Sequence, residues 1–462
     1  MSCLYISAAH KSSGKTTLCI GLARALRDRG LSLQTFKKGP DYIDPLWLTS
    51  ASGNPCYNLD FNTQSDAEIK SLFARHMADK QVGMIEGNLG LYDGMDVEGS
   101  NSNAALACML DIPVILVINT RGMTRGIAPL LLGYQAFDTN VRIAGVILNQ
   151  VGGGGHRSKL EGVIERYTDI RVLGVIRRDP ALNIDERHLG LIPSNEEDDS
   201  EQLITRLANT VRENIDLDAL LNIADSAEVL PSSLPAARLP GQYAGLRIGF
   251  SKDKAFGFYY QDDLERFREL GVELVAIDTL HDPHLPRVDG LFLGGGFPET
   301  CMEDLERNAS LRQEIADFIE SGGPAYAECG GLIYLAGSLT WGKKSCKMAG
   351  VIPADVVMHE APQGRGYVQL RETALHPWAA GADATQVFSA HEFHHTSLQG
   401  LDISAADFAY EVMRGTGIDG KHDGYVYKNL LASYAHRRDT GKSPWIERFL
   451  AHVEGSKLNQ VR

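Results

Sequence analysis

The stretch LYISAAHKSSGKTT, residues 4–17, decides the fold of the first half of the chain. An apolar run ends at Ala8, a turn rich in Ser and Gly follows, and an amphipathic helical pattern begins at Thr16. The turn departs from the P-loop pattern G-x-x-x-x-G-K-[ST] at Ala9, which stands where the first Gly is expected. In such a turn, backbone N–H groups at a helix N-terminus bind phosphate groups and Lys15 neutralises the β and γ oxygens. The predicted phosphate-binding residues are Ser12, Ser13, Gly14, Lys15, Thr16 and Thr17.

Short apolar runs alternate with helical patterns on both sides of a segment, DSAEVLPSSLPAARLPGQYAG at 225–245, that is rich in Pro and small residues. The alternation predicts mostly parallel sheets covered by helices on both faces, and therefore two α/β domains. We predict a domain at 1–225, a linker at 226–245 and a second domain at 246–462. The expected strands are 4–8, 82–86, 113–119, 143–149, 172–176, 247–250, 274–277, 290–293 and 325–327.

The composition is that of a soluble globular protein, with 44% apolar and 23% charged residues. Lys and Arg number 45 against 59 acidic residues, so the net charge of −14 argues against a partner bound through overall positive charge, such as nucleic acid or an anionic membrane. We expect neither partner. The seven cysteines have no CxxC spacing, and the N-terminus shows no secretory pattern, so we expect a cytoplasmic protein with reduced thiols.

Two loops that follow predicted strands are rich in carboxylates: GPDYIDP at 39–45 and MIEGNLGLYDG at 84–94. They carry Asp41, Asp44, Glu86 and Asp93, and loops of this kind meet at the carboxyl ends of parallel strands, where the phosphates also lie. Carboxylates beside a triphosphate repel it unless a divalent cation lies between them. At least two of the four are therefore predicted to bind Mg²⁺ or to orient a second substrate. A turn-forming role remains an alternative for Asp41 or Asp44 taken singly.

In the second half, AYAECGG at 325–331 places Cys329 between a buried strand and a helix, which is the turn geometry of a nucleophile. The positive end of the helix should favour the thiolate. Backbone N–H groups of the Gly-rich turn LFLGGGFPE at 291–299 and of Gly330 are candidates for an oxyanion hole. His436, in NLLASYAHRR, is the candidate base. The predicted oxyanion residues are Gly295, Gly296 and Gly330.

Taken together, AAHKSSGKTT, FKKGPDYIDP, EGNLGLYDG, PVILVINTRG and GVILNQV resemble the cobyrinic acid a,c-diamide synthase family. The resemblance implies a two-domain, glutamine-dependent amidotransferase that amidates acetate side chains of a corrinoid or related tetrapyrrole, with ATP and Mg²⁺ as cofactors. The second half resembles class I, triad-type glutamine amidotransferase domains. By this resemblance Thr16 and Glu86 bind Mg²⁺ and Asn149 reads the adenine. The carboxylate-activation site would be formed by Asp41, Ile43, Asp44 and Asp93.

The resemblance also implies partners and a reaction. L-glutamine and a tetrapyrrole carboxylate are the expected small-molecule partners, and a homodimer is a further expectation. ATP would convert an acetate carboxylate into an acyl phosphate, and ammonia released from glutamine by Cys329 and His436 would form the amide.

Departures from the family pattern affect both sites. Lys38 stands where the family has a small or apolar residue, and LWL at 46–48 replaces a segment that carries a His. Both border the expected tetrapyrrole site, so a sirohaem- or sirohydrochlorin-like substrate is favoured slightly over cobyrinate. Arg438 stands where most class I amidotransferases have the Glu that orients the catalytic His. The sequence does not name the group that orients His436.

Three alternatives remain. A switch ATPase of the partitioning type, with a non-catalytic second domain, would have its signature Lys at position 10, which is His10 here. HEFHH at 391–395 matches the zinc motif H-E-x-x-H, but that motif needs a helix and the surrounding residues alternate as in a strand. The third alternative is an enzyme of the same reaction type that acts on a different carboxylate.

Overall fold

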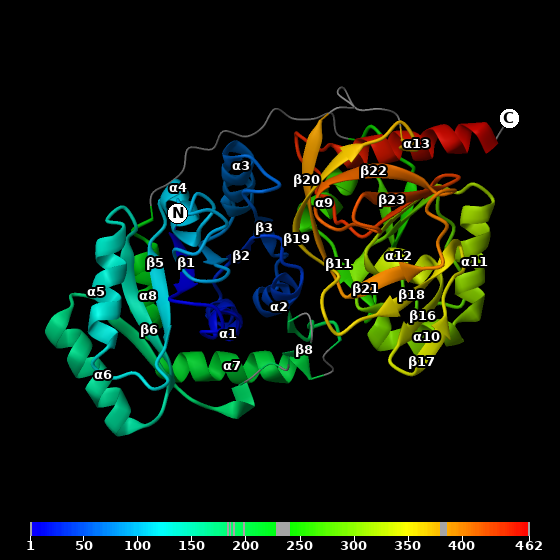
Figure 1. The fold of residues 1–462 in the computed structure, drawn as a ribbon. Coiled ribbons are helices and arrows are strands. Elements are labelled where there is room, and N and C mark those ends of the chain that lie inside the picture. The colour runs from blue at the N-terminus through cyan, green and yellow to red at the C-terminus, as the bar shows by residue number, and fades with distance from the viewer. Residues whose placement is uncertain are drawn as a thin grey trace. The chain divides into compact units, whose positions relative to one another are not determined.

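The fold was described from a computed structural model, which covers residues 2–460 except 183, 185, 188, 189, 197, 198, 228–240 and 379–385. The chain forms two compact units, residues 1–235 and 236–462 (Figure 1). Most of the linker predicted at 226–245 lies outside the described residues. No helix in the described part of the chain has the length and apolar character needed to cross a bilayer.

Unit 1 is built on a seven-stranded sheet of order β3-β2-β4-β1-β5-β6-β7, in which every neighbouring pair is parallel. Its inner strands are buried along their whole length, as expected for a parallel sheet with helices on both faces. The strands are β1 (Ser2–Ala8), β2 (Leu33–Lys38), β3 (Tyr57–Leu59), β4 (Val82–Glu86), β5 (Val114–Asn119), β6 (Ile143–Val151) and β7 (Val172–Arg177).

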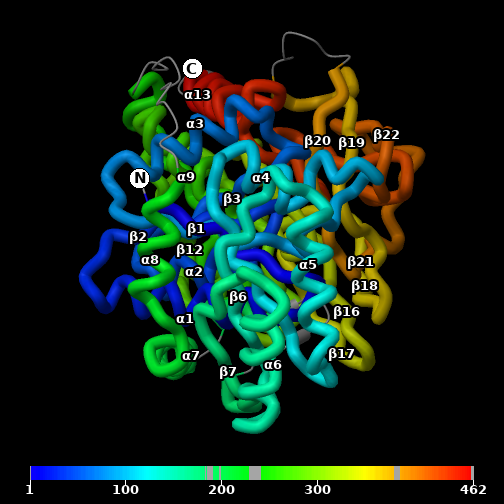
Figure 2. Tube along the Cα trace, turned by 90° about the vertical axis from the view of Figure 1, so that its left-hand side faces the viewer, coloured from blue at the N-terminus to red at the C-terminus, as the bar shows by residue number. Residues whose placement is uncertain are grey.

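Two apolar cores lie on the two faces of this sheet. One contains side chains of α1, α2, α7 and α8, and the other contains side chains of α3, α4, α5 and α6. Helices α5 and α6 run side by side in both views (Figure 1 and Figure 2). The helices are α1 (Lys15–Asp28), α2 (Ile43–Ser52), α3 (Asp66–Met77), α4 (Asn103–Leu110), α5 (Ile127–Phe137), α6 (Gly154–Tyr167), α7 (Ser200–Asn214) and α8 (Leu217–Ala224).

Unit 2 contains a nine-stranded mixed sheet of order β12-β10-β13-β15-β24-β23-β22-β19-β20. The five strands from β12 to β24 are parallel, and the remaining four extend the sheet in antiparallel fashion. The strands are β10 (Arg247–Ser251), β12 (Glu273–Ile277), β13 (Gly290–Leu293), β15 (Ala325–Glu328), β19 (Gly364–Glu372), β20 (Val387–His394), β22 (Asp407–Arg414), β23 (His422–Tyr427) and β24 (Leu430–Ser433).

Smaller elements complete unit 2. A second sheet of four strands has the order β17-β16-β18-β21, and a short pair joins β11 to β14. These strands are β11 (Phe256–Phe258), β14 (Gly295–Gly296), β16 (Ala336–Trp341), β17 (Lys344–Lys347), β18 (Ile352–Met358) and β21 (Thr396–Gln399). The helices are α9 (Gln261–Glu269), α10 (Met302–Arg307), α11 (Ala309–Glu320), α12 (Gly330–Leu335) and α13 (Trp445–Gln460).

The predicted fold class, two α/β units with a P-loop sheet in the first, is confirmed. In unit 1 the candidate residues lie at the carboxyl ends of β1, β2, β4 and β6. In unit 2 they lie after the carboxyl ends of β13, β15 and β24. Each set is therefore placed at one edge of its own sheet, at the ends of the strands and in the loops that follow them.

Candidate functional sites

The turn between β1 and α1 has the backbone of a phosphate-binding loop. Gly14 adopts φ 85°, and an added Cβ would lie 2.3 Å from Nδ2 of Asn149, so a side chain has no room at this position. Ser13 Oγ donates to the carbonyl of His10 at 2.8 Å, and Thr17 Oγ1 donates to the carbonyl of Gly14 at 3.0 Å. Both hydrogen bonds stabilise the turn. At the end of this turn lie the first backbone N–H groups of α1, which can bind phosphate.

Lys15 is held by a main-chain carbonyl of the second loop. Its Nζ donates to the oxygen of Leu89 at 2.6 Å, and Leu89 itself has a positive φ of 36°. Burial, with the nearby Lys37, lowers the pKa of Lys15 to about 8. The side chain of Lys15 is therefore hydrogen-bonded to the loop between Glu86 and Asp93.

A buried cluster of opposite charges lies next to the P-loop. Thr16 Oγ1 donates to Glu86 Oε1 at 2.6 Å and to Asp44 Oδ2 at 3.1 Å. Lys37 Nζ lies 2.5 Å from Asp44 Oδ2 and 3.0 Å from Glu86 Oε1. Burial raises the pKa of Glu86 to about 7, whereas at Asp44 the charge of Lys37 and three hydrogen bonds outweigh burial and lower the pKa.

Lys37 is the residue that the sequence analysis missed. Its ammonium is only 3% exposed, and burial, which favours the neutral amine, is outweighed by the surrounding carboxylates, so its pKa is raised. A signal was present: Lys37 lies in a parallel strand where apolar residues are expected, and β2 pairs it directly with Glu86 of β4. A lysine and a glutamate side by side in two buried strands must be an ion pair.

The structure brings Asp41, Ile43 and Asp44 together and places Asp93 in the neighbouring loop. Asp41 Oδ1 accepts the N–H groups of Ile43 and Asp44 at 2.9 and 3.0 Å, which fixes the start of α2. Burial and the charge of Asp44 raise the pKa of Asp41 to about 6. Asp93 Oδ2 accepts the N–H of Gly90 at 2.9 Å and so shapes the loop next to Leu89.

The donors at this cluster fit Mg²⁺. Glu86 Oε2 is buried and has no hydrogen-bond partner among the described residues, and the Thr16 hydroxyl lies on the other oxygen of the same carboxylate. Hard oxygen donors of this kind suit Mg²⁺. In the described part of the chain no group of three or more His, Cys, Asp or Glu side chains forms a metal cage.

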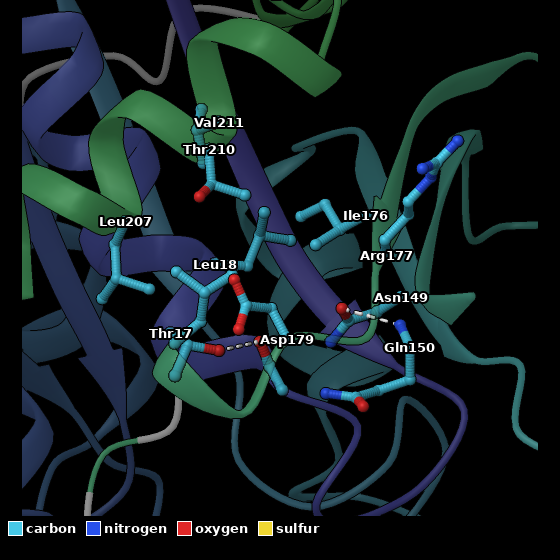
Figure 3. Close-up of a pocket in the computed structure, with 12 residues that line it drawn as sticks. Thr17, Leu18, Asn149, Gln150, Ile176, Arg177, Asp179, Leu207, Thr210 and Val211 are labelled. Carbon is cyan, nitrogen blue, oxygen red and sulfur yellow. Dashed lines mark hydrogen bonds between the residues drawn. The ribbon is translucent and has the colours of Figure 1, made fainter. Parts of the chain in front are cut away.

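A hollow beside the P-loop is lined from α1, β6, α7, the end of β7 and the segment after β7 (Figure 3). It holds about 420 Å³ of space, part of which is open solvent. Asn149 lies at its edge, donates through Nδ2 to the carbonyl of Ser13 at 2.9 Å and accepts the N–H of Gln150 through Oδ1. The apolar walls are Leu18, Ile176, Leu182, Leu207 and Val211.

In unit 2, Cys329 occupies a strained turn between β15 and α12. Its φ of 45° is unusual for a residue with a side chain, and its N–H donates to the carbonyl of Ser433 at 2.8 Å. An added Cβ at Gly331 would lie 2.1 Å from the carbonyl oxygen of Leu293. The sharp strand–nucleophile–helix turn predicted from AYAECGG is therefore observed, and its packing requires glycine after the nucleophile.

The N–H of Gly330 at the start of the helix lowers the pKa of Cys329, as expected, but other effects outweigh it. Burial raises the pKa of Cys329, the negative charges of Glu299 and Glu328 act in the same direction, and the N–H of Gly330 opposes them only in part. Helix α12 is six residues long, so its dipole is small. A neighbouring base must therefore remove the proton of the thiol.

The predicted base and the glycines of the two turns lie close together. An added Cβ at Gly295 would lie 2.4 Å from Cε1 and 3.1 Å from Nε2 of His436. An added Cβ at Gly330 would lie 2.9 Å from the backbone nitrogen of Gly296. Asp423 accepts the N–H groups of the two residues that precede His436 and so fixes the segment that carries it.

The position two residues after His436 does not orient it. Arg438 turns away and donates through Nε to Asp262 Oδ2 at 2.9 Å. The Nδ1 atom of His436 instead lies 3.3 Å from Oε2 of Glu328, and both side chains are about 4% exposed. Sequence reasoning did not identify Glu328, although it directly precedes Cys329.

The HEFHH segment lies in strand β20, as its alternation predicted, and not in a helix. Glu392 accepts the backbone N–H groups of Thr416 and Gly417 at 2.8 Å each. His391 and His436 exchange backbone hydrogen bonds, His391 N–H donating at 3.2 Å and His436 N–H at 2.7 Å. The segment therefore ties β20 to the chain that carries His436.

These two sites define a class: a nucleotide-binding unit and a glutamine amidotransferase unit in one chain. Residues 6–192 match the CobQ/CobB/MinD/ParA nucleotide binding domain, and residues 247–440 match the CobB/CobQ-like glutamine amidotransferase domain. A relative from Magnetococcus marinus named cobyrinate a,c-diamide synthase is 43% identical over 96% of this chain and 95% of its own. One of the same name from Archaeoglobus fulgidus is 40% identical over 93% of each chain.

The chain belongs to the cobyrinate a,c-diamide synthase family, whose members are carbon–nitrogen ligases with glutamine as the nitrogen donor. The alternative of a partitioning-type switch with a non-catalytic second unit is therefore set aside.

Proposed function

We propose that this chain amidates acetate carboxylates of a tetrapyrrole, with cobyrinate as the first candidate, at the expense of ATP and glutamine. The observation that carries the proposal is the buried cluster in which Thr16, Glu86 and Asp44 meet Lys37 beside the P-loop. Hydrolysis of glutamine alone has no use for such a cluster, whereas activation of a carboxylate by a nucleotide requires one.

In unit 1 the carboxylate is activated. The N–H groups of residues 12–17 and the ammonium of Lys15 bind the phosphates, and the hollow at Asn149 takes the adenine. Thr16 and Glu86 would hold Mg²⁺, which when bound neutralises phosphate charge. An oxygen of the substrate carboxylate attacks the γ-phosphorus, ADP leaves, and an acyl phosphate forms. The carboxylate-activation residues are Asp41, Ile43, Asp44 and Asp93.

In unit 2 glutamine is hydrolysed. His436 removes the proton of the Cys329 thiol, and the sulfur attacks the side-chain amide of glutamine. Backbone N–H groups near Gly295, Gly296 and Gly330 stabilise the negative oxygen of the tetrahedral intermediate. The imidazolium returns the proton to the leaving nitrogen, a thioester and ammonia form, and water releases glutamate from the thioester. Ammonia then displaces phosphate from the acyl phosphate and forms the amide.

A second candidate substrate is a sirohaem- or sirohydrochlorin-like tetrapyrrole, which Lys38 favours. The side chain of Lys38 is 7% exposed. Its Nζ donates to Oδ1 of Asn88 at 3.1 Å, in the loop next to the carboxylate-activation site. Burial lowers the pKa of Lys38 to about 8. An ammonium in this place differs in charge from the small or apolar residue of the family pattern.

The experiment is mass spectrometry of cobyrinate and of sirohydrochlorin, each incubated with the protein, ATP, Mg²⁺ and glutamine. Each amidation replaces a hydroxyl by an amino group, and the spectrum counts the replacements. Amide formation on cobyrinate that depends on ATP supports the proposal, and amide formation on sirohydrochlorin alone moves it to the second candidate. Glutamine and ATP consumption with neither tetrapyrrole amidated would contradict both.

A further inference from the structure

The carboxylate that contacts His436 comes from the strand before the nucleophile. Glu328 ends β15, directly before Cys329, and its Oε2 lies 3.3 Å from Nδ1 of His436. We propose that Glu328 is the positioning residue of the glutamine-hydrolysing site, where it takes the place of the missing Glu at Arg438. The inference rests on the proposed Cys329–His436 pair.

Glu328 is itself held in one orientation. Its Oε1 accepts the hydroxyl of Tyr326 at 2.7 Å and the backbone N–H of Arg437 at 2.9 Å. The second oxygen is thereby directed to the imidazole. Because an ionised carboxylate accepts hydrogen bonds and donates none, Nδ1 of His436 must carry the proton. Nε2 is then unprotonated and faces the Gly-rich turn at Gly295, which leaves it able to take the proton of Cys329.

Other charged groups around His436 have different partners. Arg438 bonds Asp262, and the guanidinium of Arg437 bonds the side-chain oxygens of Tyr410 and Ser443. Burial and the neighbouring His436 lower the pKa of His391 to about 3, so that ring is neutral at neutral pH.

Two further carboxylates of this unit bond to backbone N–H groups: Glu392 to Thr416 and Gly417, and Asp423 to Gly424, Tyr434 and Ala435. Tyr326 from β15 and the Cys329 thiol are uncharged, because burial raises the pKa of each. Glu328 therefore places a carboxylate 3.3 Å from Nδ1 of His436, where its charge stabilises an imidazolium.

The substitution Glu328→Gln separates orientation from folding. A glutamine can keep its oxygen on the Tyr326 hydroxyl and the Arg437 N–H, so the two bonds that hold the side chain survive. Its amino group then faces His436, and the imidazole must accept at Nδ1 and carry its proton on Nε2. In that tautomer His436 cannot remove the proton of Cys329.

Kinetics of glutamine hydrolysis on the full chain test the role. We expect Glu328→Gln to lower kcat by about 10²–10⁴-fold with little change in KM, because ground-state binding of glutamine does not use the base. Since the imidazolium loses its neighbouring negative charge, the acid limb of kcat/KM should move to lower pH by about one unit. Glu328→Asp, which keeps the charge at a greater distance, should retain more activity than Glu328→Gln.

Glu392→Gln is the matched control, because it changes a similarly buried carboxylate of the same unit, which accepts the N–H groups of Thr416 and Gly417 and pairs with His394, Oε2 lying 3.8 Å from Nε2. It should lower the thermal midpoint without moving the acid limb. Amidation driven by ammonium chloride should be normal in Glu328→Gln. If a folded Glu328→Gln protein has the wild-type kcat, or if the acid limb of its kcat/KM profile does not move, the inference about Glu328 is overturned. The proposed Cys329–His436 pair is not affected by that result. Wild-type glutamine hydrolysis by Cys329→Ser overturns the proposed pair and the inference with it.

Discussion

Three negative side chains, Asp41, Asp44 and Glu86, surround the ammonium of Lys37 in unit 1. The charges are thereby arranged before any nucleotide binds. A preorganised site of this kind stabilises charge that develops in phosphoryl transfer without having to reorganise at that moment.

At the residue scale, Lys15→Ala should abolish ATP consumption and amidation, because the charge on the β and γ oxygens is no longer balanced. We expect a fall of about 10²–10³-fold or more in kcat for amidation. Glutamine hydrolysis in the other unit should continue. Lys70→Ala, an exposed lysine of α3, is the control and should behave as wild type. Full amidation by Lys15→Ala would refute the P-loop assignment.

Asp44→Asn should slow amidation by about 10²-fold, since the ammonium of Lys37 loses the negative charge of its partner and an amide replaces the carboxylate that Lys37 and Thr16 contact. Asp93→Asn should also slow amidation, through the loop at Gly90 that it holds. ADP release and glutamate release, measured side by side, separate the two reactions. Equal loss of both would indicate misfolding instead of a local defect.

At the scale of elements, the turn before α12 depends on glycine for steric reasons. An added Cβ at Gly331 would press on the Leu293 carbonyl of β13, and backbone cannot move as a flexible side chain does. Gly331→Ala should therefore lower stability by about 1–3 kcal/mol and displace Cys329. Glutamine hydrolysis should fall while ammonia-driven amidation remains. Chemical denaturation and the two assays check this, and an alanine variant with normal hydrolysis would contradict it.

The elements also show what sequence alone could and could not reveal. The strands over 82–86 and 143–149 were predicted because a buried parallel strand reads as a continuous apolar run. The short edge strand β3 was not predicted, since three residues give no period. Cys329 and His436 follow from local patterns, but Glu328 and Lys37 act through contacts with residues 108 and 49 positions away. Only the folded chain reveals such pairs.

At the scale of the whole molecule, the two reactions should separate. Cys329→Ser should lose glutamine-dependent amidation, with a fall of up to about 10⁶-fold in glutamine hydrolysis. Free ammonia at mildly alkaline pH should restore ATP-dependent amidation, because the acyl phosphate forms without a thiol. His436→Asn should behave in the same way. Loss of the ammonia reaction in a variant that is folded by circular dichroism would contradict the two-site mechanism.

Two buried histidines should each lower the stability of the folded chain in acid. Burial lowers the pKa of His376 and of His391 to about 3, from 6.5 for the free side chain. Below pH 6.5 these two side chains bind protons in the unfolded chain but not in the folded one, so their contribution to the free energy of unfolding falls as the pH drops toward 3, whereas carboxyls with raised pKa values, such as Glu86 and Asp41, act in the opposite direction. Each such group lowers it by up to about 1.4 kcal/mol per pH unit. Thermal midpoints from pH 7 to 4 measure this, and His376→Asn should flatten the slope.

The raised pKa of Cys329 has a consequence outside the reaction itself. Alkylating reagents and peroxides react with thiolates and hardly at all with buried, protonated thiols. In the resting protein iodoacetamide should therefore label the exposed Cys108 and spare Cys329, unlike the freely reactive cysteine of a thiol protease. The buried, protonated thiol of Cys329 should for the same reason be oxidised more slowly than an exposed thiol.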